Sequence, residues 1–230
     1  PFYAESGGQV GDGGVLTWPG GSFEVTGARY LAHKVIAHAG RVVSGALKPG
    51  IKVSAAVAQR GRVETAANHS ATHLLHAALR QVLGEHVEQK GSLVEPERLR
   101  FDFSHGEPMS DTQLDKVERI VNAQVRANND VNTRLMALDD AREEGAAALF
   151  GERYEEQVRV VAMGVFSLEL CGGTHVQRTG DIGTFRILSE SGIAAGVRRL
   201  EALTGEVARQ YNTGETATLS RLAALLKTGR

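Results

Sequence analysis

The stretch VETAANHSATHLLHAALRQVL occupies residues 63–83 without glycine or proline, and Gly84 follows it. Within it, Leu75, Leu79 and Val82 recur three to four residues apart, which is the spacing of one face of a helix. The stretch is far longer than a typical strand. It therefore predicts a helix of about six turns whose apolar face packs on the rest of the fold.

Two histidines on this predicted helix, His69 and His73, are four residues apart, so their side chains leave the same face and can reach one ion. Such pairs also occur on solvated helix surfaces, so the spacing alone is weak evidence for a metal site. His76 lies three residues beyond His73 and could compete as a ligand. We expect it instead to pack near the site or to contact a ligand.

The composition of the 230-residue chain, 42% hydrophobic and 23% charged, predicts a soluble globular protein with one large or two small domains. The single cysteine cannot form an internal disulfide, which fits a reducing, cytoplasmic compartment. Lysine plus arginine total 26 against 27 for aspartate plus glutamate, so any RNA contact must come from local basic patches. No apolar run reaches the roughly 18 residues of a membrane span. Because the chain starts at Pro1, directly before a motif, we expect a segment of a longer protein.

The remaining patterns predict an α+β fold around the long helix. Short β-branched runs separated by glycine predict a small barrel or sandwich, with strands at 23–26, 34–36, 41–43 and 51–53. Ser110 and Gln113 form a capping-box pattern ahead of an apolar series, which predicts a second helix. Further strands are expected at 99–103, 131–135, 158–163, 167–170 and 184–189, and further helices at 139–150 and 217–227. The region 63–205 is therefore predicted to be α+β.

A second candidate motif is Cys171-Gly172-Gly173-Thr174-His175, in which two glycines let the chain turn tightly between a thiol and an imidazole. Together with the pair on the helix, it supplies three imidazoles and one thiolate, a set that suits Zn²⁺ in number and softness. The alternative is a buried free cysteine near a loop histidine. The other histidines have no partner at ligand spacing and are expected to be ordinary residues; they are His33, His38, His86 and His105.

The same motifs argue against familiar hydrolases. A zinc protease with the HExxH motif needs a glutamate directly after its first histidine, and this chain has Ser70 there. The sequence contains no Gly-x-Ser-x-Gly elbow and no Walker loop. Acyl-enzyme chemistry and nucleotide hydrolysis therefore lack their usual markers.

Seven segments, in this order, resemble the editing region of alanyl-tRNA synthetases, and together they span nearly the whole chain. They are FYAESGGQVGD at 2–12, NHSATHLLHAALR at 68–80, EQKGSLV at 88–94, RFDFSH at 100–105, ALFGE at 148–152, ELCGGTH at 169–175 and GVRRLEALTG at 196–205. The combination is far more specific than any one of these motifs.

The resemblance implies a small β-barrel over residues 1–60, an α+β editing (deacylase) domain of the alanyl/threonyl-tRNA synthetase type over 61–205, and a helical linker at 206–230 toward a missing C-terminal part. It implies catalytic roles at the amino-acid pocket for Thr72 and Gln89, which would otherwise be interpreted as a helix-surface hydroxyl and a loop amide. It also implies the remaining site residues: zinc ligands His69, His73, Cys171 and His175, and substrate-binding residues Gly7, Gly8 and Gln9.

The activity that the resemblance implies is removal of wrongly attached serine or glycine from alanine tRNA. The implied partners are the acceptor end of tRNA(Ala) and the aminoacylation and C-terminal domains of the same chain. A pocket that accepts alanine cannot strongly exclude glycine or serine, because one missing methyl changes binding by only about 1–3 kcal/mol. A second site must therefore hydrogen-bond the serine hydroxyl, and Thr72 is the candidate for that contact.

Two alternatives stay open on sequence grounds: a free-standing editing deacylase that acts in trans, and a non-enzymatic zinc-containing tRNA-binding module. Four protein ligands are typical of a closed structural zinc site, whereas catalytic zinc usually keeps one position for water. The sequence therefore leaves open whether zinc activates water or only organises the pocket.

Overall fold

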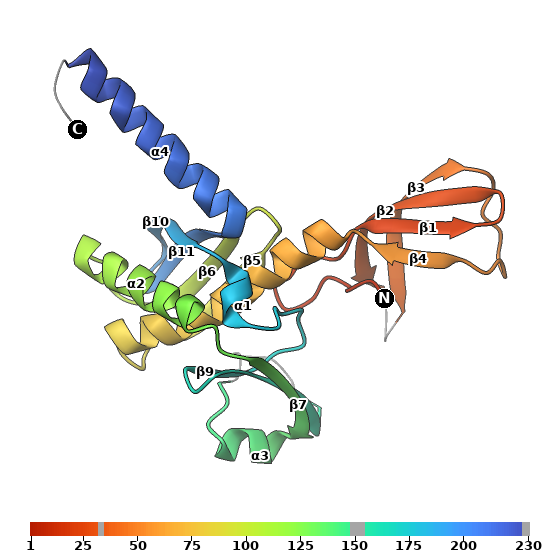
Figure 1. The fold of residues 1–230 in the computed structure, drawn as a ribbon. Coiled ribbons are helices and arrows are strands. Elements are labelled where there is room, and N and C mark those ends of the chain that lie inside the picture. Colours follow the sequence, from red (N-terminus) through yellow and green to blue (C-terminus); the bar gives the residue numbers. More distant parts are fainter. Residues whose placement is uncertain (32–34, 148–154, 227–230) are drawn as a thin grey trace.

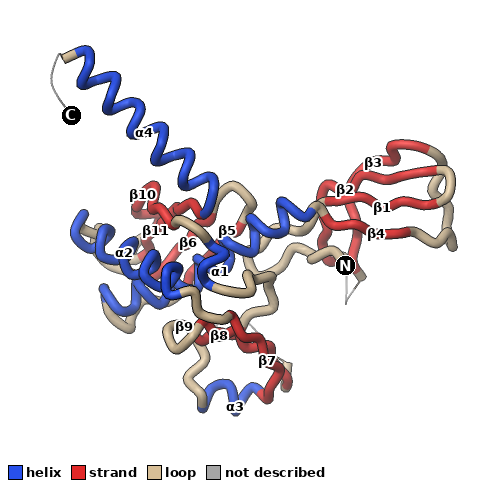
Figure 2. The backbone as a smooth tube through the Cα atoms, viewed as in Figure 1, coloured by secondary structure: helices blue, strands red, loops and turns tan. Residues whose placement is uncertain are grey.

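The computed structural model describes residues 1–31, 35–147 and 155–226. In these ranges the chain forms three antiparallel sheets connected by helices, as Figures 1 and 2 show. The predicted α+β class is confirmed. No helix among the described residues combines the length and apolarity that a membrane crossing needs.

The N-terminal sheet has the strand order β3-β2-β1-β4. Its strands are β1 (Gly14–Trp18), β2 (Gly21–Tyr30), β3 (Ile36–Ser44) and β4 (Ser54–Val57). In the described residues β3 and β4 form opposite edges and do not pair, so the sheet is open and the expected closed barrel is not observed. The strand expected at 51–53 is wrong. Those residues follow a turn in which the Ile51 amide donates to the Lys48 carbonyl, and strand pairing starts only at Ser54.

Helix α1 (Gln59–Leu83) confirms the long predicted helix and begins four residues before the quoted stretch. In Figure 1 it extends from the N-terminal sheet into the centre of the molecule. There it packs against α2 (Asp111–Ala127) and against the sheet β10-β11-β6-β5. The strands of this sheet are β5 (Gln89–Val94), β6 (Leu99–Ser104), β10 (Phe185–Ala194) and β11 (Val197–Thr204). The main core lies in this layer and includes Leu75, Leu79, Phe101, Phe103 and Val121.

The start of α2 confirms the predicted capping box. The backbone N–H of Gln113 donates to the Ser110 hydroxyl at 3.3 Å, and the backbone N–H of Ser110 donates to Gln113 Oε1 at 2.8 Å. Two of the four backbone N–H groups that a helix start leaves unpaired are thereby satisfied. The α2 face built by Val117, Val121 and Val125 is buried against the core.

The third sheet, β7-β8-β9, forms a smaller layer below α1 in Figure 1. Its strands are β7 (Val131–Ala137), β8 (Gln157–Met163) and β9 (Ser167–Leu170), and α3 (Leu138–Glu143) follows β7. The helix expected at 139–150 is shorter than predicted because Gly145 has a φ of +82°, which ends the helical backbone, and residues 148–150 lie outside the described ranges. A short 3₁₀ turn, η1 (Thr179–Ile182), leads from this layer back to β10.

Helix α4 (Gly205–Leu225) is longer than the helix expected at 217–227, of which residue 227 is not described. It projects away from the body of the molecule in Figure 1. Its first turns contact β10 and β11, and Ala208 is its buried residue.

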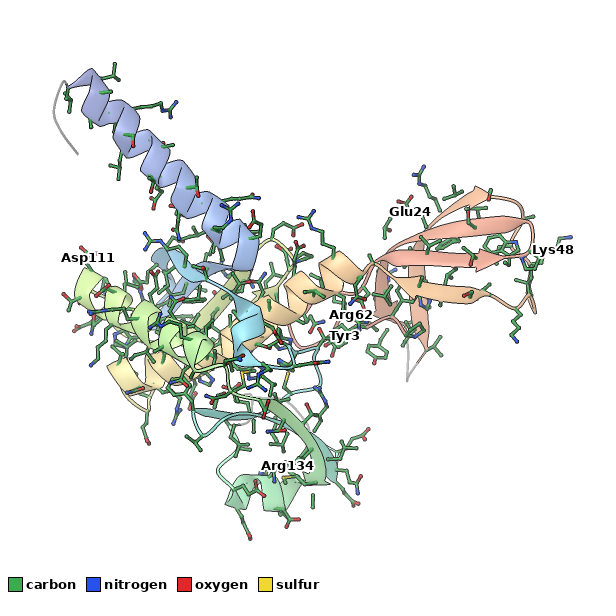
Figure 3. All side chains as sticks on the ribbon, viewed as in Figure 1. Tyr3, Glu24, Lys48, Arg62, Asp111 and Arg134 are labelled. Atoms are coloured by element: carbon green, nitrogen blue, oxygen red, sulfur yellow. The ribbon has the colours of Figure 1, made fainter. Side chains whose placement is uncertain are left out.

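The N-terminal segment is fastened to α1 by one buried carboxylate. Arg62 Nε donates to Asp12 Oδ1 at 3.0 Å, and the Tyr3 amide donates to the same side chain. Tyr3 and Arg62 are labelled at this junction in Figure 3. The segment before β1 is thereby held against the helix that carries the histidine pair.

Candidate metal centre

Four side chains from two segments gather at the centre of the molecule. His69 and His73 come from the buried middle of α1, and Cys171 and His175 come from the loop after β9. Their candidate ligand atoms all lie within 4.8 Å of one another. Among the described residues this is the one group of three or more histidine, cysteine or acidic side chains arranged to hold a metal ion. The structure thus brings together the four residues predicted from sequence.

Two distances in this cluster match those of a tetrahedral zinc site. Cys171 Sγ lies 3.4 Å from His69 Nε2 and 3.3 Å from His175 Nε2. Zn–N distances near 2.0 Å and Zn–S distances near 2.3 Å place neighbouring ligand atoms of a tetrahedron about 3.3–3.6 Å apart. The donor set, one thiol and three imidazoles, is also of the kind that zinc prefers.

Each histidine of the cluster contacts a different neighbour through its other ring nitrogen. His69 Nδ1 lies 2.7 Å from Gln9 Oε1, His175 Nδ1 lies 3.1 Å from the Ser70 hydroxyl, and His73 Nδ1 lies 2.6 Å from Glu169 Oε2. Such outer contacts orient the rings of metal-binding histidines and fix their tautomers.

Glu169 also joins His76 to the centre. Its Oε1 lies 3.0 Å from His76 Nδ1, and the His76 ring packs against Phe101. The expectation that His76 packs near the site or contacts a ligand therefore matches its position, because it meets His73 through Glu169. A bound Zn²⁺, the Cys171 thiolate and the Glu169 carboxylate would together carry no net charge, which favours burial of the ion.

The electrostatics of the cluster favour ionised acids. Burial raises the pKa of the Cys171 thiol, but His69, His175 and His73 outweigh burial and hold the pKa well below its usual range. Burial likewise raises the pKa of Glu169, and contacts with His73 and His76 outweigh it, so the pKa is lowered. The thiolate is the form of cysteine that binds metal.

The pKa values of His175 and His73 shift in opposite directions. Burial lowers the pKa of His175 to about 3, so that ring is neutral and able to ligate. Burial also lowers the pKa of His73, but the charges of Glu169 and Cys171 outweigh burial and raise it to about 10. A histidine ligates metal through an unprotonated nitrogen, so any proton on the ligating nitrogen of His73 leaves when the ion binds.

The loop between the thiol and the last histidine is held by Arg159 of β8. Arg159 Nη1 donates to the carbonyls of Cys171, at 2.8 Å, and of Gly173, at 2.7 Å. The Gly173 amide in turn donates to Cys171 Sγ at 3.3 Å. A Cβ atom at Gly173 would lie 2.1 Å from His69 Cε1, so only glycine lets the loop approach the helix this closely.

A cavity of about 570 Å³ opens beside the cluster. Its volume is in the usual range for small-molecule sites. Residues from the N-terminal segment, α1, β5, β8 and the loop after β9 line it, among them Tyr3, Gly7, Thr72, Gln89, Arg159 and Cys171.

The two predicted pocket residues both line this cavity. Thr72 is buried, and its hydroxyl donates to the Asn68 carbonyl at 2.9 Å, so the oxygen keeps lone pairs free to accept a hydrogen bond. Gln89, predicted as a loop residue on sequence grounds, is the first residue of β5 and donates from Nε2 to the Ser92 hydroxyl at 3.3 Å.

The three predicted substrate-binding residues, Gly7, Gly8 and Gln9, do not all lie at the cavity. Gly7 lines the cavity. Gly8 pairs with β5, where its carbonyl accepts from the Val94 amide at 2.8 Å. Gln9 is fully buried and lies behind His69, with its amide engaged by His69 and Thr174. Among these three predicted substrate-binding residues, only Gly7 is placed at the cavity wall.

The remaining histidines are placed outside the cluster. His38 packs edge-on against Phe2. His86 and His105, which have no partner at ligand spacing in the sequence, contact each other: His86 Nε2 lies 2.9 Å from His105 Nδ1 and their rings stack. His33 lies outside the described residues.

Sequence reasoning missed several residues that support the cluster: Ser70, Arg159 and Glu169. Both Ser70 and Glu169 lie inside the quoted motifs, Ser70 directly after His69 and Glu169 two residues before Cys171, and this position was the available signal. Nothing in the sequence around Arg159 marked it, because its acceptors are two backbone carbonyls.

Comparisons with known proteins find similarity to tRNA synthetases. Residues 158–201 match the family described as the threonyl and alanyl tRNA synthetase second additional domain, and residues 1–60 match the class II (A) tRNA synthetases. The chain is 60% identical over 228 residues to an alanine–tRNA ligase of Idiomarina loihiensis, covering 99% of this chain and 26% of that protein. It is 57% identical over 227 residues to that of Nitrosomonas eutropha, covering 99% of this chain and 26% of that protein.

The alanine–tRNA ligase of Methylococcus capsulatus is 57% identical over all 230 residues, again covering 26% of its own length. The chain therefore spans about a quarter of the length of these relatives. Along its whole length it resembles the part of alanyl-tRNA synthetases that contains their editing region.

Proposed function

We propose that this chain hydrolyses the ester bond of alanine tRNA that wrongly carries serine or glycine, with a zinc ion bound by His69, His73, Cys171 and His175. The observation that carries the proposal is that three members of the four-residue cluster, His69, His73 and Cys171, line the same cavity as Thr72 and Gln89. The similarity to alanine–tRNA ligases supplies the substrate class.

When bound, zinc supplies positive charge and Lewis acidity at the cavity wall. The chain's own residues hold and select the substrate. The ester between an amino acid and a ribose is activated, so positioning it beside water contributes much of the rate.

Thr72 is the proposed reader of the serine hydroxyl. Because its own proton is donated to the Asn68 carbonyl, Thr72 Oγ1 acts as an acceptor, and the serine hydroxyl donates to it. An alanine methyl in the same place would leave the acceptor lone pairs of this buried hydroxyl unpaired, and an unsatisfied buried acceptor costs about 1–3 kcal/mol. Glycine leaves the space open for a water molecule.

Gln89 is the proposed partner of the substrate's amino group. Its Nε2 donates to Ser92, which orients the amide so that Oε1 serves as an acceptor. A protonated α-amino group is a donor that matches this oxygen.

The proposed division of the chain is a small β unit at 1–60, the editing domain at 61–205, and a helical linker at 206–230 that leads to further parts of a cytoplasmic synthetase. Three arginines of β11 and α4 are each paired with a carboxylate in the structure: Arg198 with Glu190, Arg199 with Asp102, and Arg209 with Glu206. We therefore propose that the aminoacylation and C-terminal domains of the longer protein make most of the contacts that bind tRNA(Ala).

The test is release of radioactive serine or glycine from mischarged tRNA(Ala). The wild-type chain is expected to hydrolyse both esters, and His73→Gln, which removes one ligand, is expected to lose that activity. His86→Gln removes a histidine outside the cluster and serves as the matched control. A wild-type chain that binds tRNA but releases no amino acid would favour the non-enzymatic tRNA-binding module.

A further inference from the structure

We infer that Gln9 is a positioning residue of the metal centre: its side-chain amide fixes the ring of His69 and the loop after Cys171 in the geometry that receives zinc. The inference rests on the proposed zinc site. It moves Gln9 from the substrate-binding role implied by resemblance to a structural role in ligand orientation, and it makes the N-terminal segment part of the centre.

Gln9 reaches the centre through a tight turn. The backbone N–H of Gln9 donates to the Ser6 carbonyl at 3.0 Å, and the backbone N–H of Ser6 donates to the Gln9 backbone carbonyl at 3.2 Å. Gly7 and Gly8 have φ values of +58° and +81°, a region that favours glycine. The next residue, Val10, donates its amide to the Val94 carbonyl of β5. The turn is thus anchored on the main sheet, and the Gln9 side chain points inward with no exposed surface.

The hydrogen bonds of Gln9 determine which end of its amide faces His69. The Thr174 backbone N–H can only donate, and it lies 2.9 Å from Gln9 Oε1. The same oxygen lies 2.7 Å from His69 Nδ1, so Nδ1 must carry the proton. Gln9 Nε2 then donates to the Thr174 hydroxyl at 2.9 Å. All polar atoms of this buried amide are therefore used in a consistent pattern.

The tautomer of His69 follows from this pattern. In the neutral ring, a proton on Nδ1 leaves Nε2 with its lone pair, and Nε2 is the nitrogen that lies 3.4 Å from Cys171 Sγ. A metal ligand needs that unprotonated nitrogen, and an outer hydrogen bond of this kind typically changes metal affinity 10- to 100-fold when it is removed.

The same amide also connects the helix to the loop. His69 belongs to α1, whereas Thr174 lies between the two loop ligands, Cys171 and His175. A Cβ atom at Gly173 would lie 2.9 Å from Gln9 Oε1, so the loop packs directly on the amide. One side chain from the N-terminal segment therefore sets the spacing between the two pairs of ligands.

The experiment measures zinc affinity of the 230-residue chain by competition with a coloured chelator, without any tRNA. Gln9→Met keeps the length of the side chain and removes its hydrogen bonds, and we expect it to weaken zinc binding about 10- to 100-fold. Gln9→Glu keeps the acceptors for His69 and Thr174, whose hydroxyl can rotate to donate, so it is expected to restore affinity to within a few fold. Thr174→Val removes only the bond from Nε2 and is expected to have a smaller effect than Gln9→Met.

Two further measurements separate ligand orientation from general stability. The absorption spectrum of the Co²⁺-substituted chain is expected to change in Gln9→Met and to be preserved in Gln9→Glu. Thermal unfolding of the metal-free variants provides the stability reference. If Gln9→Met does not fold, Gln9→Asn, which is one carbon too short to reach His69, takes its place with the same expected loss.

Wild-type zinc affinity in Gln9→Met would overturn the inference. It would also be overturned if Gln9→Met and Gln9→Glu lost equal zinc affinity and this loss matched the loss of stability of the metal-free variants. A wild-type chain that binds no zinc would overturn the zinc site and this inference together. A wild-type chain that binds zinc and hydrolyses no ester would contradict the proposed function. The zinc affinities of the Gln9 variants would then decide the role of Gln9 by themselves.

Discussion

Replacing Gly173 by alanine is expected to weaken zinc binding strongly, whereas the same change at the neighbouring Gly172 is expected to be harmless. A Cβ atom at Gly173 would lie 2.1 Å from His69 Cε1 and 2.4 Å from His69 Nδ1, against 3.4–4 Å for ordinary contact. The ring would have to retreat by about 1 Å, and Gln9 and the core of α1 block that movement.

The magnitude follows from two limits. Zinc–ligand distances tolerate changes of only about 0.2 Å, so a displacement near 1 Å removes His69 from the ligand set or distorts it severely. Overpacking of this kind costs about 1–3 kcal/mol, which corresponds to about a 5- to 150-fold change in an equilibrium constant. We therefore expect zinc affinity to fall by one to two orders of magnitude in Gly173→Ala.

Gly172 provides the matched control in the same loop. A Cβ atom there meets nothing within 4 Å, and its φ lies outside the left-handed region. Gly172→Ala is expected to keep wild-type zinc affinity and to gain up to about 1 kcal/mol of stability through the unfolded chain. The assay is chelator competition with thermal unfolding in parallel. Equal zinc affinities in the two variants would refute the close packing of this loop on His69.

Three further outcomes are expected. Thr72→Val should reduce the preference for seryl over alanyl ester by about 10- to 100-fold, because it removes the acceptor for the serine hydroxyl; parallel deacylation of both tRNAs measures this ratio, and an unchanged ratio would place the contact elsewhere. Arg159→Met should weaken zinc binding while leaving the helices intact by circular dichroism, because two loop carbonyls lose their donor; wild-type affinity would show that the loop holds itself. Hydrogen bonds from Arg209 and Gln210 lower the pKa of Glu206 to about 2, so its contribution to stability is complete above the unfolded value of 4.5 and is lost as pH falls through about 2. The stability difference between wild type and Glu206→Gln should therefore shrink over that interval, and a constant difference would contradict the shift.

Local signals were enough to predict α1, α2 and the four candidate ligands. Helical periodicity identified the two helices, and the capping box at Ser110 marked where α2 begins. The spacing of His69 and His73 and the glycines before His175 are also local, and chemistry alone suggested that they share one ion.

Features that depend on distant partners were not predictable in this way. Strand β11 was not predicted, and it contains two consecutive charged residues, Arg198 and Arg199. In the structure Arg199 lies opposite Asp102 on β6 and pairs with it at 2.7 Å, so the charges are matched within the sheet. Strand β5 was missed because Gly91 interrupts its pattern, and its register shifts at that glycine.

The position of Gln9 shows the same limit for the site. Its partners, His69 and Thr174, are 60 and 165 residues away, so no spacing rule could connect them. The prediction of an N-terminal barrel failed for a different reason. Runs of β-branched residues predict strands, but they do not specify whether the two edge strands pair, and in the described residues the edge strands β3 and β4 do not pair.

The central claim, zinc-dependent removal of the wrong amino acid, is tested most directly by one comparison of rates. The 230-residue chain, stripped of metal and then reconstituted with one equivalent of Zn²⁺, is incubated with seryl-tRNA(Ala) and alanyl-tRNA(Ala), and release of each amino acid is followed. We predict that the reconstituted chain releases serine much faster than alanine and that the stripped chain releases both at the uncatalysed rate. Equal rates for the two esters, or full activity without metal, would contradict the account.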